Sequence, residues 1–120
     1  MPKRRVVFSN GECYHIYNRS TGGIHIFEKI RSLTRATSLV DYYRYPQRLR
    51  YSKYRILSLP DRKIYENNFR KQSPLIEIYT FCIMPNHFHF LVKQLSDHGI
   101  NKFVSNFQNG YAKYFNIKND

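Results

Sequence analysis

Short segments with the composition of β-strands occur near the start of the chain and again in its second half. Residues 13–19 alternate apolar and polar side chains, and Ser-Thr-Gly-Gly at residues 20–23 then predicts a tight loop. Further along, residues 74–84 have strong β-propensity, Pro-Asn at residues 85–86 is typical of a turn, and residues 87–93 return as a strand. The sequence therefore predicts one separate strand and one hairpin.

Two longer segments carry apolar residues at steps of three or four, the spacing of one helix face. The first runs from about residue 26 to 45, where Pro46 ends it. Its predicted apolar face comprises Phe27, Ile30, Leu33, Ala36, Val40 and Tyr43. The second follows Asp97, which can cap a helix, and continues through Gly110, which weakens a helix without ending it. Its apolar stripe comprises Ile100, Phe103, Val104, Phe107, Tyr111, Tyr114 and Phe115.

The segment between the first helix and the hairpin is the most basic part of the chain. Residues 44–71 hold nine Lys and Arg against two acidic residues, and Leu-Pro-Asp-Arg at residues 59–62 predicts a short helix that ends at about Asn68. Because tyrosines lie between the cations, we expect a path for single-stranded nucleic acid, with a solvated, partly disordered loop as the alternative. The candidate contacts are Arg44, Arg48, Arg50, Tyr51, Lys53, Tyr54 and Arg55.

The order strand, helix, basic insertion, strand, strand, helix is that of an α+β fold. It indicates a ferredoxin-like antiparallel sheet with helices on one face, and with the basic insertion between the first helix and the central hairpin. A chain of 120 residues is long enough for one domain. We expect residues 1–120 to lack the last strand of this arrangement, because the chain reaches Asp120 as a helix is finishing.

The charge of the chain predicts a polyanionic partner. The 20 Lys and Arg against 8 Asp and Glu give a formal net charge of +12, and phosphates would relieve the self-repulsion of so basic a domain. Nucleic acid fits best. An anionic membrane is the rival, but the 11 Tyr and 9 Phe are spread along the chain and are not gathered on one amphipathic helix. Arg4 and Arg5 are either a basic arm that contacts phosphates or a mobile terminus.

The chain has no apolar segment that approaches the roughly 20 residues of a membrane span, which excludes a transmembrane protein. Its basic N-terminus has too short an apolar segment for a signal peptide, so we expect a cytoplasmic protein. Cys13 and Cys82 fit neither a disulfide framework nor a Cys-x-x-Cys site, and we expect both to be small, reduced core residues.

Two histidines, His87 and His89, stand in the strand after the turn. Side chains alternate between the faces of a strand, so both imidazoles should project from one face, about 7 Å apart at their backbones. Phe88, Phe90 and Val92 should then face the helices. The pair can share one metal ion if at least one more ligand joins it. The alternative is that both are ordinary outward polar residues of an amphipathic strand.

The segment Met-Pro-Asn-His-Phe-His-Phe-Leu-Val at residues 84–92 resembles the signature of the HUH single-tyrosine transposases. These include the REP-associated tyrosine transposases and related insertion-sequence enzymes. Residues 14–19 are similar to the opening strand of that family, and residues 99–116 to the helix after its histidine strand. The resemblance implies a ferredoxin-like fold, a homodimer, hairpins in single-stranded DNA as substrate, and a divalent metal with a tyrosine nucleophile.

The resemblance also implies roles for particular residues. His87 and His89 would be the histidine ligands of Mg²⁺ or Mn²⁺, and Arg19, at the end of the first strand, would hold a phosphate beside them unless it is an ordinary strand-end cation. The nucleophile of the family lies on a later helix, so we expect it beyond Asp120. Tyr111 and Tyr114 are weak candidates, because their places on the apolar stripe favour core packing.

Three hypotheses of function follow. The first is a transposase for single-stranded DNA, which cuts and rejoins strands through a phosphotyrosine, here in a truncated form that binds hairpins and lacks the nucleophile. The second is a ferredoxin-like module that binds single-stranded nucleic acid without cutting it. The third is a dimerising fragment whose affinity for DNA is nonspecific. Dependence on metal separates them, whereas dependence on salt does not.

Overall fold

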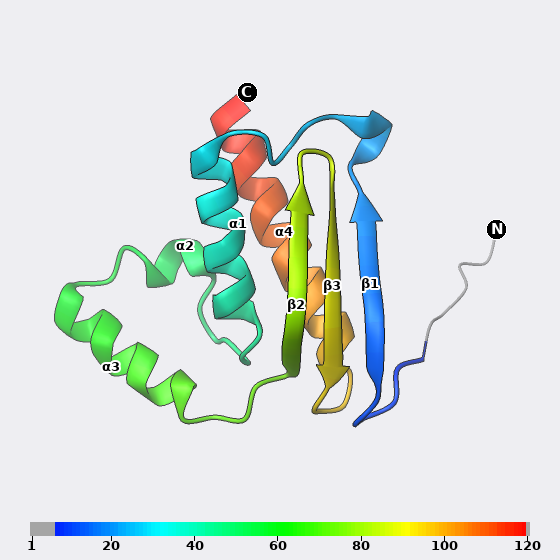
Figure 1. Cartoon of the computed structure of the whole chain (residues 1–120). Coiled ribbons are helices and arrows are strands. Elements are labelled where there is room, and N and C mark those ends of the chain that lie inside the picture. Colours follow the sequence, from blue (N-terminus) through cyan, green and yellow to red (C-terminus); the bar gives the residue numbers. More distant parts are fainter. Residues whose placement is uncertain (1–6, 120) are drawn as a thin grey trace.

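The computed structural model describes residues 7–119, which form three strands and four α-helices (Figure 1). The basic arm predicted at Arg4 and Arg5 lies outside these residues. In chain order the elements are β1 (Cys13–Arg19), the 3-10 turn η1 (Thr21–Gly23), α1 (Ile30–Tyr43), α2 (Tyr51–Tyr54), α3 (Leu59–Arg70), β2 (Ile76–Met84), β3 (His87–Gln94) and α4 (Gly99–Asn119).

The three strands form one antiparallel sheet in the order β1-β3-β2, with β3 in the centre. Helices α1 and α4 lie side by side on one face of this sheet, and the face turned toward the viewer in Figure 1 has no helix over it. This is the predicted α+β, ferredoxin-like arrangement, which the structure confirms. Among residues 7–119 there is no fourth strand.

The core lies between the sheet and the two helices. From β3 it receives Phe88, Phe90 and Val92, which the alternation of the strand predicts. The helix α4 contributes the predicted stripe, of which Ile100, Phe103, Phe107 and Tyr111 are buried and Val104, Tyr114 and Phe115 are partly buried against the core. Aromatic rings dominate these contacts, and Phe90 meets both Phe103 and Phe107 edge to face.

The first helix differs from its prediction at both ends. It begins at Ile30 and not near residue 26, because the backbone N–H of Phe27 donates to the carbonyl oxygen of Pro85 (2.9 Å) and so belongs to the loop that closes on the hairpin turn. Ile30 is 83% exposed and lies outside the core, whereas Leu39 is 1% exposed and is a core residue that the predicted face omits. The helix ends at Tyr43, before Pro46.

The cap of α4 also differs from the prediction. The Asp97 carboxylate accepts a hydrogen bond from the Asn10 side chain (2.7 Å). The backbone N–H of Ile100, in the first turn, instead donates to Oε1 of Gln94 (3.1 Å), a side chain that is 2% exposed. The side-chain amide of Gln94 also donates, through Nε2, to the Phe8 carbonyl oxygen (3.0 Å). One buried glutamine therefore joins the end of β3, the start of α4 and the segment before β1.

The basic insertion is ordered around aromatic residues, which excludes the predicted alternative of a partly disordered loop. Its two helices, α2 and α3, lie beside the sheet (Figure 1), and α2 was not predicted. The hydroxyl of Tyr65 accepts from the backbone N–H groups of Arg48 and Leu49 (3.1 Å each), and that of Tyr42 donates to the Leu49 carbonyl oxygen (2.6 Å). Burial raises the pKa of Tyr42, which stays a neutral donor.

Replacing Gly99 with alanine should destabilise the fold. A Cβ at this buried position would overlap the carbonyl oxygen of Leu75, which is fixed because it accepts from the N–H of Leu95 (3.1 Å). Overpacking of this kind costs about 1–3 kcal/mol, more than the better helix propensity of alanine recovers. Urea denaturation of G99A measures the effect. Asn101→Ala, at an exposed position of the same turn, is the matched control, and equal stability of both variants would contradict the prediction.

Candidate functional site

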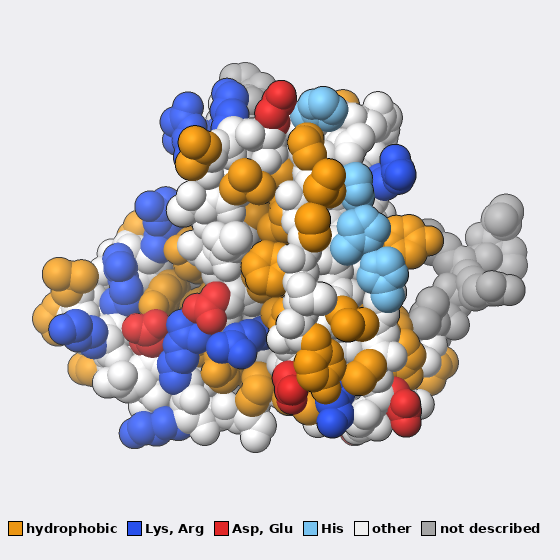
Figure 2. All heavy atoms as spheres, viewed as in Figure 1, with side chains coloured by type: hydrophobic (Ala, Val, Ile, Leu, Met, Phe, Trp, Pro, Cys, Tyr) orange, Lys and Arg blue, Asp and Glu red, His pale blue; other side chains and the backbone are white. Residues whose placement is uncertain are grey.

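His87 and His89 lie side by side on the open face of the sheet. The buried Phe88 and Phe90 alternate with them on β3 and point to the helices, so the pleat of the strand presents both imidazoles outward. The centroids of the two rings are 5.0 Å apart and the rings are nearly perpendicular, at 86°. Figure 2 shows histidine side chains gathered along this face of the molecule.

The hydrogen bonds of the pair leave one nitrogen of each ring exposed to a ligand. Nδ1 of His87 is 2.7 Å from Oδ1 of Asn86, and because an amide oxygen only accepts, Nδ1 carries the proton and Nε2 of His87 keeps its lone pair. Nδ1 of His89 is 2.9 Å from Nε2 of His15. Within residues 7–119, no hydrogen bond engages Nε2 of either His87 or His89. Each ring is thus held through Nδ1, as metal-binding histidines commonly are.

The loop before α1 holds the hairpin turn that precedes the pair. The backbone N–H of Ser20 donates to the carbonyl oxygen of Asn86 (2.9 Å), and that of Phe27 donates to the carbonyl oxygen of Pro85 (2.9 Å). Two segments far apart in the sequence are therefore tied together where β3 starts. This fixes Asn86, and through Asn86 the orientation of the His87 ring.

Strand β1 brings three further side chains to the pair. Arg19 is the register partner of His87, and Tyr17 is the partner of His89. The Tyr17 ring is 65% exposed and lies over His89, with ring centroids 5.9 Å apart and an angle of 27° between the planes. His15 stacks on His89 at 5.1 Å. Sequence reasoning missed Tyr17, although its place at an even spacing from Arg19 on a strand is the signal that would have found it.

Partial loss of hydration, and after it the charges of His15, His87 and Arg19, lower the pKa of His89. The imidazole of His89 is therefore neutral at neutral pH and offers a lone pair. Arg19, one of the charges that cause this shift, would also attract a phosphate.

Strand β2 brings sulfur to the same face. Cys82 is the register partner of His89 and Met84 is the partner of His87, and their sulfur atoms are 3.5 Å apart. The prediction that Cys13 and Cys82 are core residues is wrong, since both are exposed. Both lie on the face of the sheet that no helix covers, so the alternation that buries their neighbours places them outside.

A comparison with protein-family models matches residues 47–120 to the family described as "Transposase IS200 like". The matched residues are more than half of the chain and include the histidine strand. The chain belongs to the IS200-like transposase family. No curated protein and no solved structure matches it. Strand β1, with the segment that resembles the opening strand of the family, lies before the matched residues.

Membership in the IS200-like transposases confirms the family predicted from the sequence, and it makes DNA the partner and transposition the class of function. It also accounts for the net charge of +12, because a positive charge attracts the phosphates of DNA. Among residues 7–119, no helix is both long and apolar enough to cross a membrane.

A divalent metal, which this transposase family typically uses, would find part of a ligand set here. Two imidazole nitrogens face the open side, and imidazole suits Mn²⁺ better than it suits Mg²⁺, which prefers oxygen. A divalent ion takes about four to six donor atoms. In the part of the chain that the structure describes, no cluster of three or more His, Cys, Asp or Glu side chains is placed to hold a metal ion. The donors present therefore fit as two ligands of an incomplete set.

The weak tyrosine candidates of the IS200-like transposase lie on the other side of the sheet, in the helical layer. Tyr111 is 2% exposed, its hydroxyl donates to the carbonyl oxygen of Ile26, and burial raises its pKa. Tyr114 is half-buried on α4, with the guanidinium carbon of Arg35 4.4 Å from the centre of its ring. Neither tyrosine is brought to the histidine pair, and packing accounts for Tyr111.

The basic residues predicted to contact DNA divide into different environments. Arg44 is engaged with Asp41 (3.5 Å), while Arg48 and Lys53 are exposed. Arg50 and Arg55 are also exposed and line a cleft between α1, α2 and α4. The tyrosines predicted with them, Tyr51 and Tyr54, are half-buried and pack against the aromatic core of the insertion.

Replacing His15 with asparagine should raise the pKa of His89. The substitution removes one of the charges that lower this pKa. The folded protein binds a proton at His89 less readily than the unfolded chain does. His89 therefore lowers the free energy of unfolding as the pH falls through 6.5, the ordinary pKa of histidine. The H15N variant should lose less stability than the wild type over this pH range. An NMR titration of the histidine Cε1–H signals measures the pKa. An unchanged His89 pKa in H15N would contradict the interpretation.

Proposed function

We propose that this chain is the DNA-binding and metal-binding part of a single-tyrosine transposase that acts on hairpins in single-stranded DNA. The observation that carries the proposal is the pair of imidazoles on β3, each held through Nδ1, in a chain of the IS200-like transposase family. His87 and His89 would hold Mg²⁺ or Mn²⁺, with the remaining donors supplied by water, by phosphate oxygens of the DNA or by a residue outside 7–119.

The open face offers contacts for a scissile phosphate and its neighbouring base. A divalent ion, when bound, polarises a phosphate and stabilises the oxygen that leaves. Arg19, across from His87, would contact a phosphate oxygen there, and the exposed Tyr17 ring would stack on an unpaired base. His15 holds the ring of His89 through its Nδ1.

Covalent strand transfer needs a tyrosine whose deprotonated oxygen forms a bond to phosphorus. The bond between phosphorus and the sugar oxygen breaks in the same step, and the leaving sugar oxygen takes up a proton. The buried Tyr111 and the half-buried Tyr114 stand in the helical layer and not beside the histidines. Tyr17 does lie over His89, where we assign it to stacking on a base. We propose that the nucleophile lies beyond Asp120, and that the 120-residue chain binds hairpins without forming a phosphotyrosine. We propose further that the form of the protein that acts on DNA is a homodimer.

A second function is favoured by the open sheet itself. An exposed aromatic ring on an uncovered sheet face, together with a high positive charge, is also what a non-catalytic module for single-stranded nucleic acid uses. Such a module would have no need of imidazole nitrogens directed to solvent. Metal binding therefore separates the two functions.

The double variant H87A/H89A should lose Mn²⁺ binding. Isothermal titration of the wild-type chain with MnCl₂ should show one site, and removal of both imidazoles should weaken it at least about tenfold, as the loss of metal ligands and their partners commonly does. The matched control is H25A/H98N, which removes two exposed histidines elsewhere and keeps a residue that tolerates the positive φ of His98. Equal Mn²⁺ affinity in both double variants would favour the non-catalytic module.

Incubation with labelled hairpin DNA and Mn²⁺ tests the missing nucleophile. On a native gel the wild-type chain should shift the hairpin, and on a denaturing gel no covalent protein–DNA adduct should remain. An adduct would contradict the proposal, and single substitutions of Tyr111, Tyr114 and Tyr17 by phenylalanine would then identify its source.

Tyr17→Ala should weaken the binding of single-stranded DNA by about 1–3 kcal/mol, because stacking of one base on an aromatic ring contributes that much. Tyr17→Phe keeps the ring and should bind as the wild type does, which makes it the matched control. Fluorescence anisotropy with a labelled oligonucleotide measures both. If Y17A binds as tightly as the wild type, no base stacks on this ring.

A further inference from the structure

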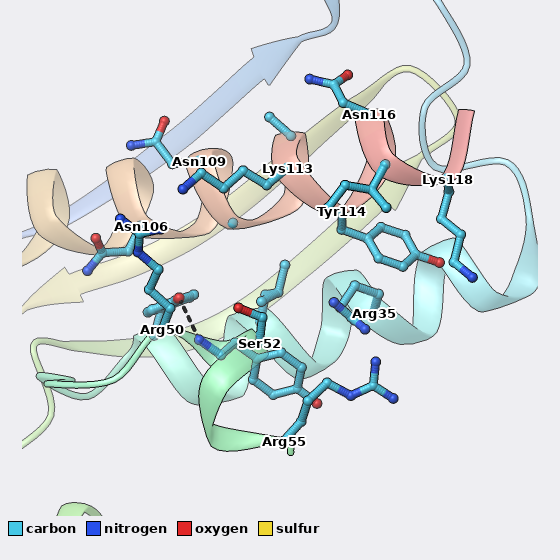
Figure 3. Close-up of a pocket in the computed structure, with 16 residues that line it drawn as sticks. Arg35, Arg50, Ser52, Arg55, Asn106, Asn109, Lys113, Tyr114, Asn116 and Lys118 are labelled. Atoms are coloured by element: carbon cyan, nitrogen blue, oxygen red, sulfur yellow. Dashed lines mark hydrogen bonds between the residues drawn. The ribbon is translucent and has the colours of Figure 1, made fainter. Parts of the chain in front are cut away.

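A cleft of about 710 Å³ lies between α1, α2 and α4, in the helical layer and thus on the side of the sheet opposite to the histidine pair. Three separate parts of the chain supply cations to its lining. These cations are Arg35 from α1, Arg50 and Arg55 on either side of α2, and Lys113 and Lys118 from α4. Figure 3 shows this cleft with the side chains that line it.

The positive charge of the cleft has no neutralising partner in the described part of the chain. No Asp or Glu is among the lining residues, and none of the five cations forms an ion pair within residues 7–119. The arginines that do pair, Arg44 and Arg70, share Asp41 outside the cleft (3.5 Å and 2.6 Å). Within residues 7–119, no carboxylate therefore neutralises the cleft, which stays cationic.

Arg35 shows that this concentration of charge has an energetic cost. Its guanidinium carbon lies 4.4 Å from the centre of the Tyr114 ring and 5.3 Å from that of Tyr51. Burial, and after it the charge of Arg55, lower the pKa of Arg35. Two guanidinium groups close enough to repel one another, with no carboxylate between them, form a site that an anion would stabilise.

The uncharged part of the lining is suited to bases. The rings of Tyr51 and Tyr114 line the cleft together with the amides of Asn106 and Asn109 and the hydroxyl of Ser52. Amides and hydroxyls can donate to and accept from the edges of unpaired bases, and tyrosine rings can stack on their faces. A free inorganic anion could accept from the amides and the hydroxyl, but it would leave the faces of the two rings without a contact.

We propose that this cleft binds single-stranded DNA, its cations contacting consecutive phosphates and its polar side chains and rings contacting unpaired bases. The lining groups that contact base edges and ring faces favour a single strand over a duplex, whose bases are already paired and stacked. The inference rests on the proposed function only in taking DNA as the substrate. Because the histidine pair lies on the other face of the sheet, the strand in the cleft is a different segment from the one at the histidines, and it anchors the DNA without being cut.

The test compares two triple variants that remove the same charge. R55Q/K113Q/K118Q neutralises one arginine and two lysines of the cleft, and R31Q/K29Q/K102Q neutralises one arginine and two lysines that are exposed outside it. Fluorescence anisotropy at several salt concentrations, with a single-stranded oligonucleotide and a duplex of the same sequence, gives affinity and its salt dependence. The melting temperature of each variant reports whether it folds. Neutralisation of the crowded cations should leave this temperature unchanged or raise it.

The cleft variant should bind the single strand at least tenfold more weakly, and the slope of log K against log salt should fall by about 2, since each lost phosphate contact with a single strand contributes about 0.7. The outside variant should keep most of the slope. Equal losses in both variants, or an equal loss for the duplex and the single strand, would overturn the proposal.

The same proteins separate this inference from the proposed function. The cleft variant should retain the Mn²⁺ affinity of the wild type, because its substitutions lie on the other side of the sheet from His87 and His89. Failure of the wild type to bind Mn²⁺ would overturn the proposed metal site and leave the result for the cleft intact.

Discussion

The structure depends on the burial of one face of β3. Phe88, Phe90 and Val92 pack against the rings of α4, and as a direct result of the strand's pleat the residues between them must face outward. A shift of the register by one residue would bury the two imidazoles and expose the phenylalanines. The hydrophobic packing that stabilises the domain therefore also fixes which side of the sheet carries the histidines, and the tie between the loop after β1 and the hairpin turn refines their orientation.

Much of this arrangement could be predicted from the sequence because it follows from periodicity. The strands, the long final helix and the face that carries His87 and His89 all depend on local alternation or on a helical repeat, and the structure agrees. Predictions that depended on contacts between distant segments were less successful. The start of α1 is set by a hydrogen bond from Phe27 to the turn at Pro85, and the first turn of α4 is capped by Gln94. Neither partner can be inferred from the sequence around the helix.

The environment of side chains on the open face was equally hard to foresee. Cys13 and Cys82 stand in apolar segments, so their composition suggests burial, yet within residues 7–119 helices cover one side of the sheet and leave the other open. In the insertion, the alternation of cations and tyrosines suggested one continuous binding surface. The structure divides it. Tyr42 and Tyr65 organise the segment by hydrogen bonds to its backbone, Arg44, Arg62 and Arg70 lie over tyrosine rings of the insertion, and Arg48, Arg50 and Arg55 are exposed.

If DNA binds as proposed, the placement of the histidine pair and the cationic cleft on opposite sides of the sheet makes the molecule bivalent toward a single polymer. Once a strand is held at one position, the other position meets it at an effective concentration set by the length and stiffness of the intervening nucleotides. A strand too short to pass around the sheet edge can occupy only one of the two at a time. Affinity is then a property of the length of the DNA as much as of its sequence, and the sheet itself acts as the spacer.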